Sequence, residues 1–144
     1  MNSNNPYKEA MRYIDNAKST LELAGRDGKY YVDEKYVKTA CGTAYSGVLK
    51  SLDLLFQIKN IPKKRGRKSI DYYRDVLTVL DKKLLKNLNT AYHVLHLEGY
   101  YEGETGIKVI EAGIDYATSI ILALKPYSKN GKELNHYALQ VHRF

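Results

Sequence analysis

Five positive charges fall within six consecutive positions near the middle of the 144-residue sequence. The stretch PKKRGRKS contains Lys63, Lys64, Arg65, Arg67 and Lys68. Because clustered Lys and Arg side chains neutralise phosphate groups, residues 63–68 are a candidate contact for a nucleic acid or a nucleotide. The net charge is +7, and removing these five charges leaves +2. An electrostatic footprint would therefore be confined to one loop, here named the basic loop, instead of covering a whole face.

The centre of the basic loop, Arg65-Gly66-Arg67, resembles the Arg-Gly-Arg core of an AT-hook, in which two arginines lie in a narrow minor groove. An AT-hook continues with a proline that keeps the backbone extended. Here Lys68 follows, and Ser69 is a suitable cap for a helix. A short loop held at both ends has little freedom to lie in a groove, so the pattern favours a tethered loop over a DNA-binding arm.

Tyrosine is the unusual residue of the composition, with 14 Tyr against two Phe and no Trp. Three adjacent pairs fall at predicted helix ends: Tyr30–Tyr31, Tyr72–Tyr73 and Tyr100–Tyr101. They could stack on bases or anchor an interface. The interpretation that we favour is structural: each pair sends one ring into the core and leaves one hydroxyl in water. The second and third pairs are predicted to lie at the end of the molecule that carries the basic loop.

The histidines do not form a recognisable catalytic or metal-binding pattern. His93 and His96 are three residues apart on a predicted helix, a spacing that could present two imidazoles to a metal. A third ligand is needed, and none of the available groups has a known ligand spacing to this pair: Glu98, Cys41, His136 and His142. No G-x-S-x-G turn or phosphate-binding glycine fingerprint is present. We expect no catalytic residues, no metal and no cofactor.

Apolar residues recur at helical spacing in five segments, which must position these groups. Suitable caps and stops bound the segments at Asn5–Pro6 and Gly25, at Asp33 and Phe56, at Ser69 and Leu80, at Asp81 and Gly99, and at Thr105 and Pro126. The pattern predicts an all-α protein, an antiparallel up-and-down bundle of four to five helices with a C-terminal extension. We expect one domain with the bundle in residues 1–125 and a tail in residues 126–144. Four apolar residues of the tail are spaced for one more short helix: Leu134, Tyr137, Ala138 and Val141.

The second predicted helix is rich in small residues, including Gly42 and Gly47. Each glycine lowers helix stability by about 1 kcal/mol relative to alanine. We therefore expect a neighbouring helix or a bulky tyrosine to pack closely against the bare backbone.

The topology of an up-and-down bundle predicts a neighbour for the basic loop. Two predicted helices separate this loop from the loop after the fourth helix, so both should lie at the same end. The second loop and its flank carry Glu98, Glu102 and Glu104. Ion pairs with these glutamates would weaken the positive field available to a phosphate backbone.

The order and spacing of the segments resemble HEPN-like helical bundles, and more closely a family of small bacterial proteins with that architecture. The resemblance rests on PYKEAMRYIDNAKSTL, KYVKTACGTAYSGVLKSLD, GRKSIDYYRDVL, NLNTAYHVLHLEGYYEG and GIKVIEAGIDYA. Ribonucleolytic HEPN domains carry an Arg followed after four to six residues by a His. The nearest approach here is Lys86 with His93, and Lys lacks the planar guanidinium of Arg. The resemblance implies a non-catalytic member.

These observations lead to one expected function and two alternatives. The single cysteine cannot form an internal bridge, and the N-terminus and the aliphatic run of residues 120–124 lack the apolar length of a signal peptide or membrane span. We expect a cytoplasmic, non-enzymatic interaction module without a membrane role, which self-associates or binds a partner protein. The first alternative is a protein that binds nucleic acid or nucleotide through residues 63–68, with Tyr72 and Tyr73 nearby. The second is a divergent HEPN ribonuclease.

Overall fold

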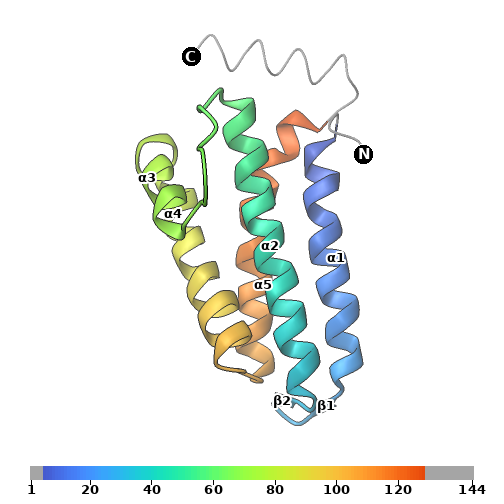
Figure 1. Cartoon of the computed structure of the whole chain (residues 1–144). Helices are drawn as coiled ribbons and strands as arrows, with labels where there is room; N and C mark the ends of the chain where they lie inside the picture. Colours follow the sequence, from blue (N-terminus) through green and yellow to red (C-terminus); the bar gives the residue numbers. More distant parts are fainter. Residues whose placement is uncertain (1–4, 129–144) are drawn as a thin grey trace.

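The predicted helical stripes form a helical bundle with a small hairpin at one end (Figure 1). The computed structural model describes residues 5–128. Its elements in chain order are α1 (Pro6–Ala24), β1 (Arg26–Asp27), β2 (Tyr30–Tyr31), α2 (Glu34–Ile58), α3 (Ile70–Leu80), α4 (Lys82–Ala91), the π-helix η1 (Tyr92–Tyr101), α5 (Ile107–Ile121) and the 3₁₀-helix η2 (Leu122–Tyr127). The all-α prediction is confirmed. The expected tail helix lies outside the described residues.

The predicted caps begin four of the five helices. Asn5, Asp33, Ser69 and Asp81 each accept a hydrogen bond from a backbone N–H in the first turn of the helix that follows. For example, the Asn5 side chain accepts from Lys8 N at 2.9 Å, and Asp81 accepts from Leu84 N at 3.0 Å. These bonds satisfy donors that a helix cannot satisfy internally.

The expected cap at Thr105 is wrong. The cap of α5 is Gly106, whose backbone N–H donates to Glu104 Oε2 at 2.8 Å. The Thr105 carbonyl instead accepts from the backbone N–H of Tyr31 at 2.9 Å. The short strands β1 and β2, where we expected only a turn, thus extend their hydrogen bonding to the start of α5. We call this part of the molecule the hairpin end.

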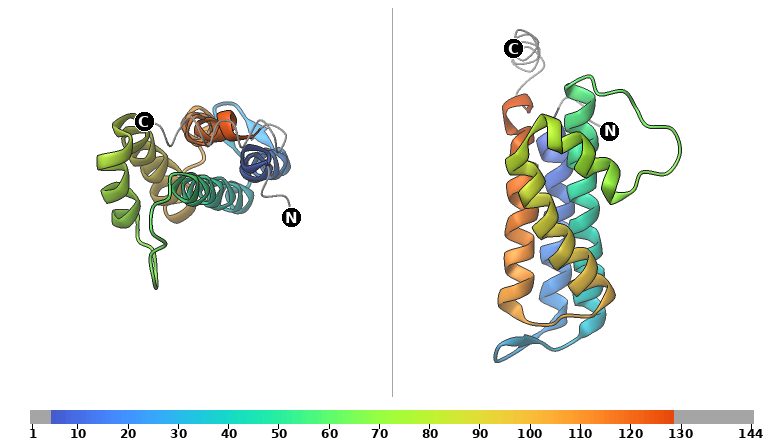
Figure 2. Two further views of the ribbon diagram at one scale, coloured as in Figure 1. Left: turned by 90° about the horizontal axis from the view of Figure 1, so that it is seen from above. Right: turned by 90° about the vertical axis from the view of Figure 1, so that its left-hand side faces the viewer.

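Four long helical segments form the bundle, and α3 packs outside them on α4 (Figures 1 and 2). The segments are α1, α2, the continuous α4–η1 helix and α5. The chain runs down α1, up α2, down α4–η1 and up α5. Buried side chains between them form the core, among them Ile14, Val48, Leu88 and Ile114. Helix α3 contributes Tyr73 and Leu77 to this core.

The basic loop and the acidic residues lie at opposite ends of the bundle, which corrects the expected meeting of the two loops. The basic loop follows the end of α2, whereas the segment containing Glu102 and Glu104 adjoins the hairpin and the start of α2. The 25 residues of α2 separate these places by about 37 Å. The expectation failed because α3 is not a bundle helix. Only one bundle helix, the α4–η1 helix, then separates the two loops, which places them at opposite ends. The pair Tyr100–Tyr101 is therefore at the hairpin end as well.

Close packing against the two glycines of α2 confirms the expected reason for them. A Cβ atom added at Gly47 would lie 2.6 Å from Cβ of Tyr13, on α1. A Cβ added at Gly42 would lie 3.2 Å from the ring of Tyr100. The Cβ of Tyr13 is fixed directly on the backbone of α1. The ring of Tyr100, in contrast, belongs to a residue that is 44% exposed.

These contacts predict different effects on stability for the same substitution at two positions. Gly47→Ala should lower the free energy of unfolding by about 1–3 kcal/mol, because α1 and α2 must separate to admit the methyl group. Gly42→Ala is the matched control. It should be neutral or stabilising by up to about 1 kcal/mol, because the Tyr100 ring can shift and alanine favours the helix. Urea unfolding of both variants measures the difference, and equal effects would contradict the packing explanation.

Candidate functional site

A cationic cleft lies where the chain leaves α2 and returns to it at α3. Its volume is about 440 Å³. We call it the lysine cleft, and its lining residues are Lys50, Asp53, Leu54, Phe56, Gln57, Ile61, Lys63, Lys64, Lys68 and Tyr72. Three of the lysines come from the basic loop, and Lys50 comes from α2. The cleft thus combines the predicted basic loop with an α2 face that the sequence had not linked to it.

Asp53 fixes the returning chain against α2. One oxygen of its carboxylate, Oδ1, accepts from the Tyr73 hydroxyl at 2.9 Å and lies 3.0 Å from Lys68 Nζ. The Tyr73 side chain is buried beside Phe56. Burial, followed by the hydrogen bond to the Asp53 carboxylate, raises the pKa of Tyr73. The hydroxyl therefore stays protonated at neutral pH and remains a donor to Asp53.

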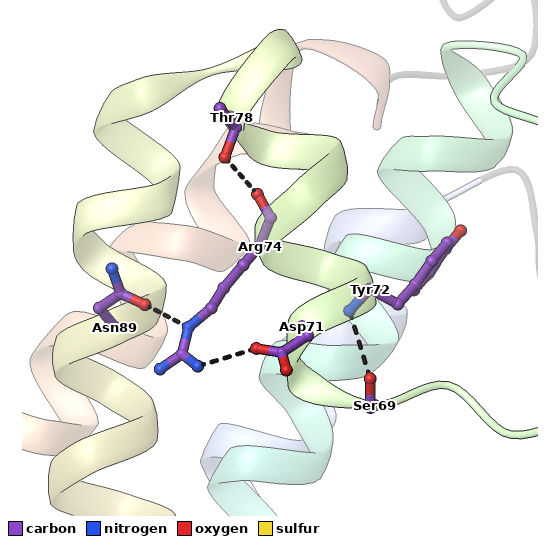
Figure 3. A network of polar contacts seen from close by, with 6 residues as sticks. All are labelled: Ser69, Asp71, Tyr72, Arg74, Thr78 and Asn89. Carbon is purple, nitrogen blue, oxygen red and sulfur yellow. Dashed lines mark hydrogen bonds and ion pairs between the residues drawn. The ribbon is translucent and has the colours of Figure 1, made fainter.

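Arg74 holds α3, which carries Tyr72 of the cleft, on α4 (Figure 3). Its Nε donates to Asn89 Oδ1 at 2.8 Å, and its Nη1 lies 3.3 Å from Asp71 Oδ1. The guanidinium carbon also lies 5.1 Å from the centre of the Tyr92 ring. A planar cation can serve all three partners at once, which a lysine could not do.

The charges around the cleft are unbalanced. In the described part of the chain, Lys50, Lys63, Lys64 and Lys68 share the cleft with one carboxylate, Asp53, which already contacts Lys68 and Tyr73. Within residues 5–128, no ion pair joins Lys50, Lys63 or Lys64 to an acidic side chain. Such a site attracts anions. Its lining also contains an apolar wall, made of Leu54, Phe56, Ile61 and Tyr72.

Not every residue predicted for this site lines it. Lys63, Lys64, Lys68 and Tyr72 do, and Tyr73 is buried beneath them. Arg65 and Arg67 are exposed on the outer part of the loop and are not lining residues. Sequence reasoning missed Lys50, Asp53 and Gln57. Their spacing of three and four residues marks one polar face of α2, but only the returning loop shows that this face is part of a cleft.

The tyrosine pairs follow the structural interpretation in two of three cases. Tyr31 and Tyr73 are buried, and their neighbours Tyr30 and Tyr72 are exposed or half-buried. In the third pair the prediction is wrong, because Tyr100 and Tyr101 are both exposed, at 44% and 62%. These two rings instead pack on His96, outside the core.

His93 and His96 serve different environments and do not form a shared metal site. His93 Nε2 lies 3.4 Å from Glu98 Oε2. His96 is surrounded by tyrosine rings, with ring centres 4.7 Å from Tyr45 and 5.2 Å from Tyr92. The π-helix carries Tyr92, His96 and Tyr100 in this stack, a geometry that a prediction of α-helix did not contain.

No metal-binding group is found elsewhere in residues 5–128. No cluster of three or more His, Cys, Asp and Glu side chains is placed to hold an ion there. Cys41 is fully buried in the core, as its helical stripe predicted. Burial raises the pKa of its thiol to about 12, so it is a poor nucleophile at neutral pH. His136 and His142, considered as further ligands, lie outside the described residues.

The sequence of the described bundle matches a known family. The family is described as a domain of unknown function, DUF5618, and the match covers residues 5–125. The chain belongs to this family. A solved structure of a protein of unknown function from Dyadobacter fermentans is similar to it, with 36% sequence identity and a TM-score of 0.75. The similarity covers 87% of this chain and 97% of the Dyadobacter chain.

One further comparison and one property of the helices concern the DUF5618 chain. No curated protein gives a significant match to its sequence. Among the helices within residues 5–128, none combines the length and the apolar character needed to cross a bilayer.

The bond between Tyr73 and Asp53 predicts the effect of removing one oxygen atom. Tyr73→Phe keeps the buried ring but should lower the free energy of unfolding by about 1 kcal/mol, because Asp53 loses a donor. Tyr72→Phe is the matched control and should change stability little, since no hydrogen bond of its hydroxyl is found within residues 5–128. Equal losses in urea unfolding would contradict the anchoring role of Asp53.

The burial of His96 predicts a pH effect. Desolvation lowers its pKa below the ordinary value of about 6.5, because burial disfavours the imidazolium ion. The unfolded chain then binds the proton more readily, so the contribution of His96 to stability is lost as the pH falls through the folded-state pKa. An NMR titration of the His96 ring should show a midpoint below about 6.5. His96→Phe, which keeps a ring in the stack, should lose less stability between neutral and acidic pH. A midpoint above the ordinary value would refute the effect.

Proposed function

We propose that this chain is a non-enzymatic binding module that takes a phosphate-bearing ligand, a nucleotide or a nucleic acid, into the lysine cleft. The observation that carries the proposal is the imbalance of charge: four lysines line one cleft, and among residues 5–128 Asp53 is the only carboxylate that lines it with them. Asp53 itself is engaged by Lys68 and Tyr73. A phosphate group would supply the negative charge that Lys50, Lys63 and Lys64 lack among the side chains of residues 5–128, although the Lys64 ammonium already donates to the Arg65 carbonyl at 3.4 Å.

The apolar wall and the outer arginines suggest how such a ligand would be accommodated. Small-molecule sites commonly occupy about 300–1,000 Å³. At about 440 Å³ the cleft falls in this range. Tyr72 offers a ring at its edge on which a base can stack. Arg65 and Arg67, on the exposed part of the loop, would meet the next phosphates of a polymer.

The resemblance to HEPN-like bundles, which implies a non-catalytic member, is compatible with a binding module that is not an enzyme. We propose a cytoplasmic location for the protein, because its one cysteine is a buried free thiol, which suits a reducing compartment.

A divergent ribonuclease is the weaker hypothesis. His93, its required base, is next to Glu98, and the position expected to hold an arginine is Lys86.

A second candidate function is an interaction module that self-associates. It is favoured by exposed apolar side chains that gather at the hairpin end, including Tyr30, Val32 and Tyr101. This surface is remote from the lysine cleft, so the two functions are compatible. Isolated exposed apolar residues are ordinary on a protein surface, whereas a group of them at one end indicates an interaction site.

Phosphate binding in the cleft predicts a specific loss of affinity. The triple variant Lys50→Ala, Lys63→Ala, Lys64→Ala should bind a short single-stranded oligonucleotide at least about tenfold more weakly at low salt. The slope of log affinity against log salt should become shallower by about two. Each phosphate contact to a single strand contributes about 0.7 to this slope, and three contacts are lost. Fluorescence anisotropy at several salt concentrations measures both quantities, and inorganic pyrophosphate tests for a small ligand by calorimetry.

The matched control removes the same charge from another surface. Lys82, Lys83 and Lys86 are exposed on α4 and do not line the cleft. Changing all three to alanine should leave the affinity within about twofold of the original protein. If both triple variants lose affinity equally, the binding depends only on net charge. If neither the oligonucleotide nor pyrophosphate binds at low salt, the proposal fails.

A further inference from the structure

Exposed apolar side chains are concentrated at the hairpin end. Nine large apolar side chains are exposed within residues 5–128. Three of them, Val79, Tyr116 and Leu122, lie elsewhere. The other six lie where α1 ends, the hairpin turns, η1 ends and α5 begins: Leu23, Tyr30, Val32, Tyr100, Tyr101 and Val109. Covering these side chains with another protein surface would remove apolar area from water, which is favourable.

A hollow with a cationic rim lies within this end. Its volume is about 450 Å³, and Tyr30, Ile107 and Val109 supply its apolar lining. Lys29 and Lys108 stand at its rim, and no ion pair within residues 5–128 involves either of them. The remaining charges are engaged. Arg26 pairs with Glu111 at 3.2 Å, and Glu104 Oε2 accepts from Gly106 N.

Backbone hydrogen bonds hold the hollow in shape. Lys29 O accepts from Ile107 N at 3.0 Å, and Thr105 O accepts from Tyr31 N at 2.9 Å. These bonds join the hairpin to the start of α5, so the two sides of the hollow are tied together. A preformed hollow loses little conformational entropy when it is filled.

An aromatic and acidic projection lies at the same end, where η1 finishes. Tyr101 is 62% exposed, yet its ring is held edge-on against His96 at 5.0 Å and against Tyr100 at 5.1 Å. Glu102 follows it, is exposed, and forms no ion pair with another side chain in the described part of the chain. The projection thus presents an ordered ring with an adjacent free carboxylate.

We propose that the hollow receives Tyr101 and Glu102 of a second copy of this chain. The ring of Tyr101 enters between Tyr30 and Val109, and the carboxylate of Glu102 meets Lys29 and Lys108. Hollow and projection share one end, so a two-fold axis through that end makes both contacts at once and closes the dimer. This inference rests on self-association, the second candidate function, and supplies its geometry from complementary shape and charge.

The aromatic half of the contact is tested with two matched tyrosines. Tyr101→Ala should weaken the dimer at least about tenfold, as expected for an aromatic anchor. Tyr116→Ala removes another exposed tyrosine, on α5 and outside the hollow, and should leave the dimer unchanged. Light scattering over a concentration series measures the masses, and circular dichroism verifies that both variants are folded.

The charged half is tested by exchanging the signs. The double variant Lys29→Glu, Lys108→Glu should be monomeric, because its hollow and its Glu102 would then both be negative. Glu102→Lys should also be monomeric, because its projection and its hollow would then both be positive. An equimolar mixture should regain a dimer, since every contact again joins opposite charges. Native mass spectrometry identifies the mixed dimer at twice the 16.5 kDa of one chain.

The outcomes separate the geometry from self-association itself. A dimer that neither Tyr101→Ala nor the charge variants weaken would overturn this interface while leaving self-association intact. A constant monomer mass at all concentrations would overturn both the proposed interface and self-association. Any protein that fills the hollow would then be a different one. A dimer that forms in the mixture but not in either variant by itself would support the proposed pairing. Non-specific association would not depend on how the two signs of charge are distributed between the hollow and the projection.

Discussion

The close approach of the other helices to α2 is the constraint on which the rest of the structure depends. α2 contacts α1, η1 and α5, and its small residues leave room for Tyr13 at Gly47 and for Tyr100 at Gly42. Gly99, on η1, lies directly against the Cys41 side chain, which leaves no room for a Cβ atom at this position. Because α2 is central and tightly packed, its two ends define the two ends of the molecule, and both candidate surfaces are built on what the chain does there.

The two ends differ in the chemistry that they present. At one end the chain leaves α2, carries five cations around a loop and returns to Asp53, which leaves an excess of positive charge beside an apolar wall. At the other end the hairpin and the start of α5 combine exposed aromatic rings with charges of both signs. The first pattern suits an anionic ligand. The second suits a surface that pairs with its own kind, because opposite charges lie on different parts of it.

Much of the fold could be predicted because the information is local. Asn5, Asp33, Ser69 and Asp81 cap helices through bonds to residues two or three positions away, and the apolar stripes follow the helical period. The prediction failed where a distant partner decides the outcome. Thr105 is a good cap by type, but its carbonyl is engaged by Tyr31 and Gly106 takes its place. The basic loop was assigned acidic neighbours because α3 was counted as a bundle helix.

By itself the sequence determined which segments are helical, where most of them begin, which faces are buried and where the charge is concentrated. These properties depend on side-chain type and on spacing within a few residues. Only the tertiary structure decided that Lys50 and Asp53 face the basic loop, that Tyr100 and Tyr101 are exposed at the far end, and that His96 stacks among tyrosines instead of sharing a ligand with His93. Each of these depends on the path between helices and on the π-helical winding of η1, which arise from packing of residues far apart in the chain.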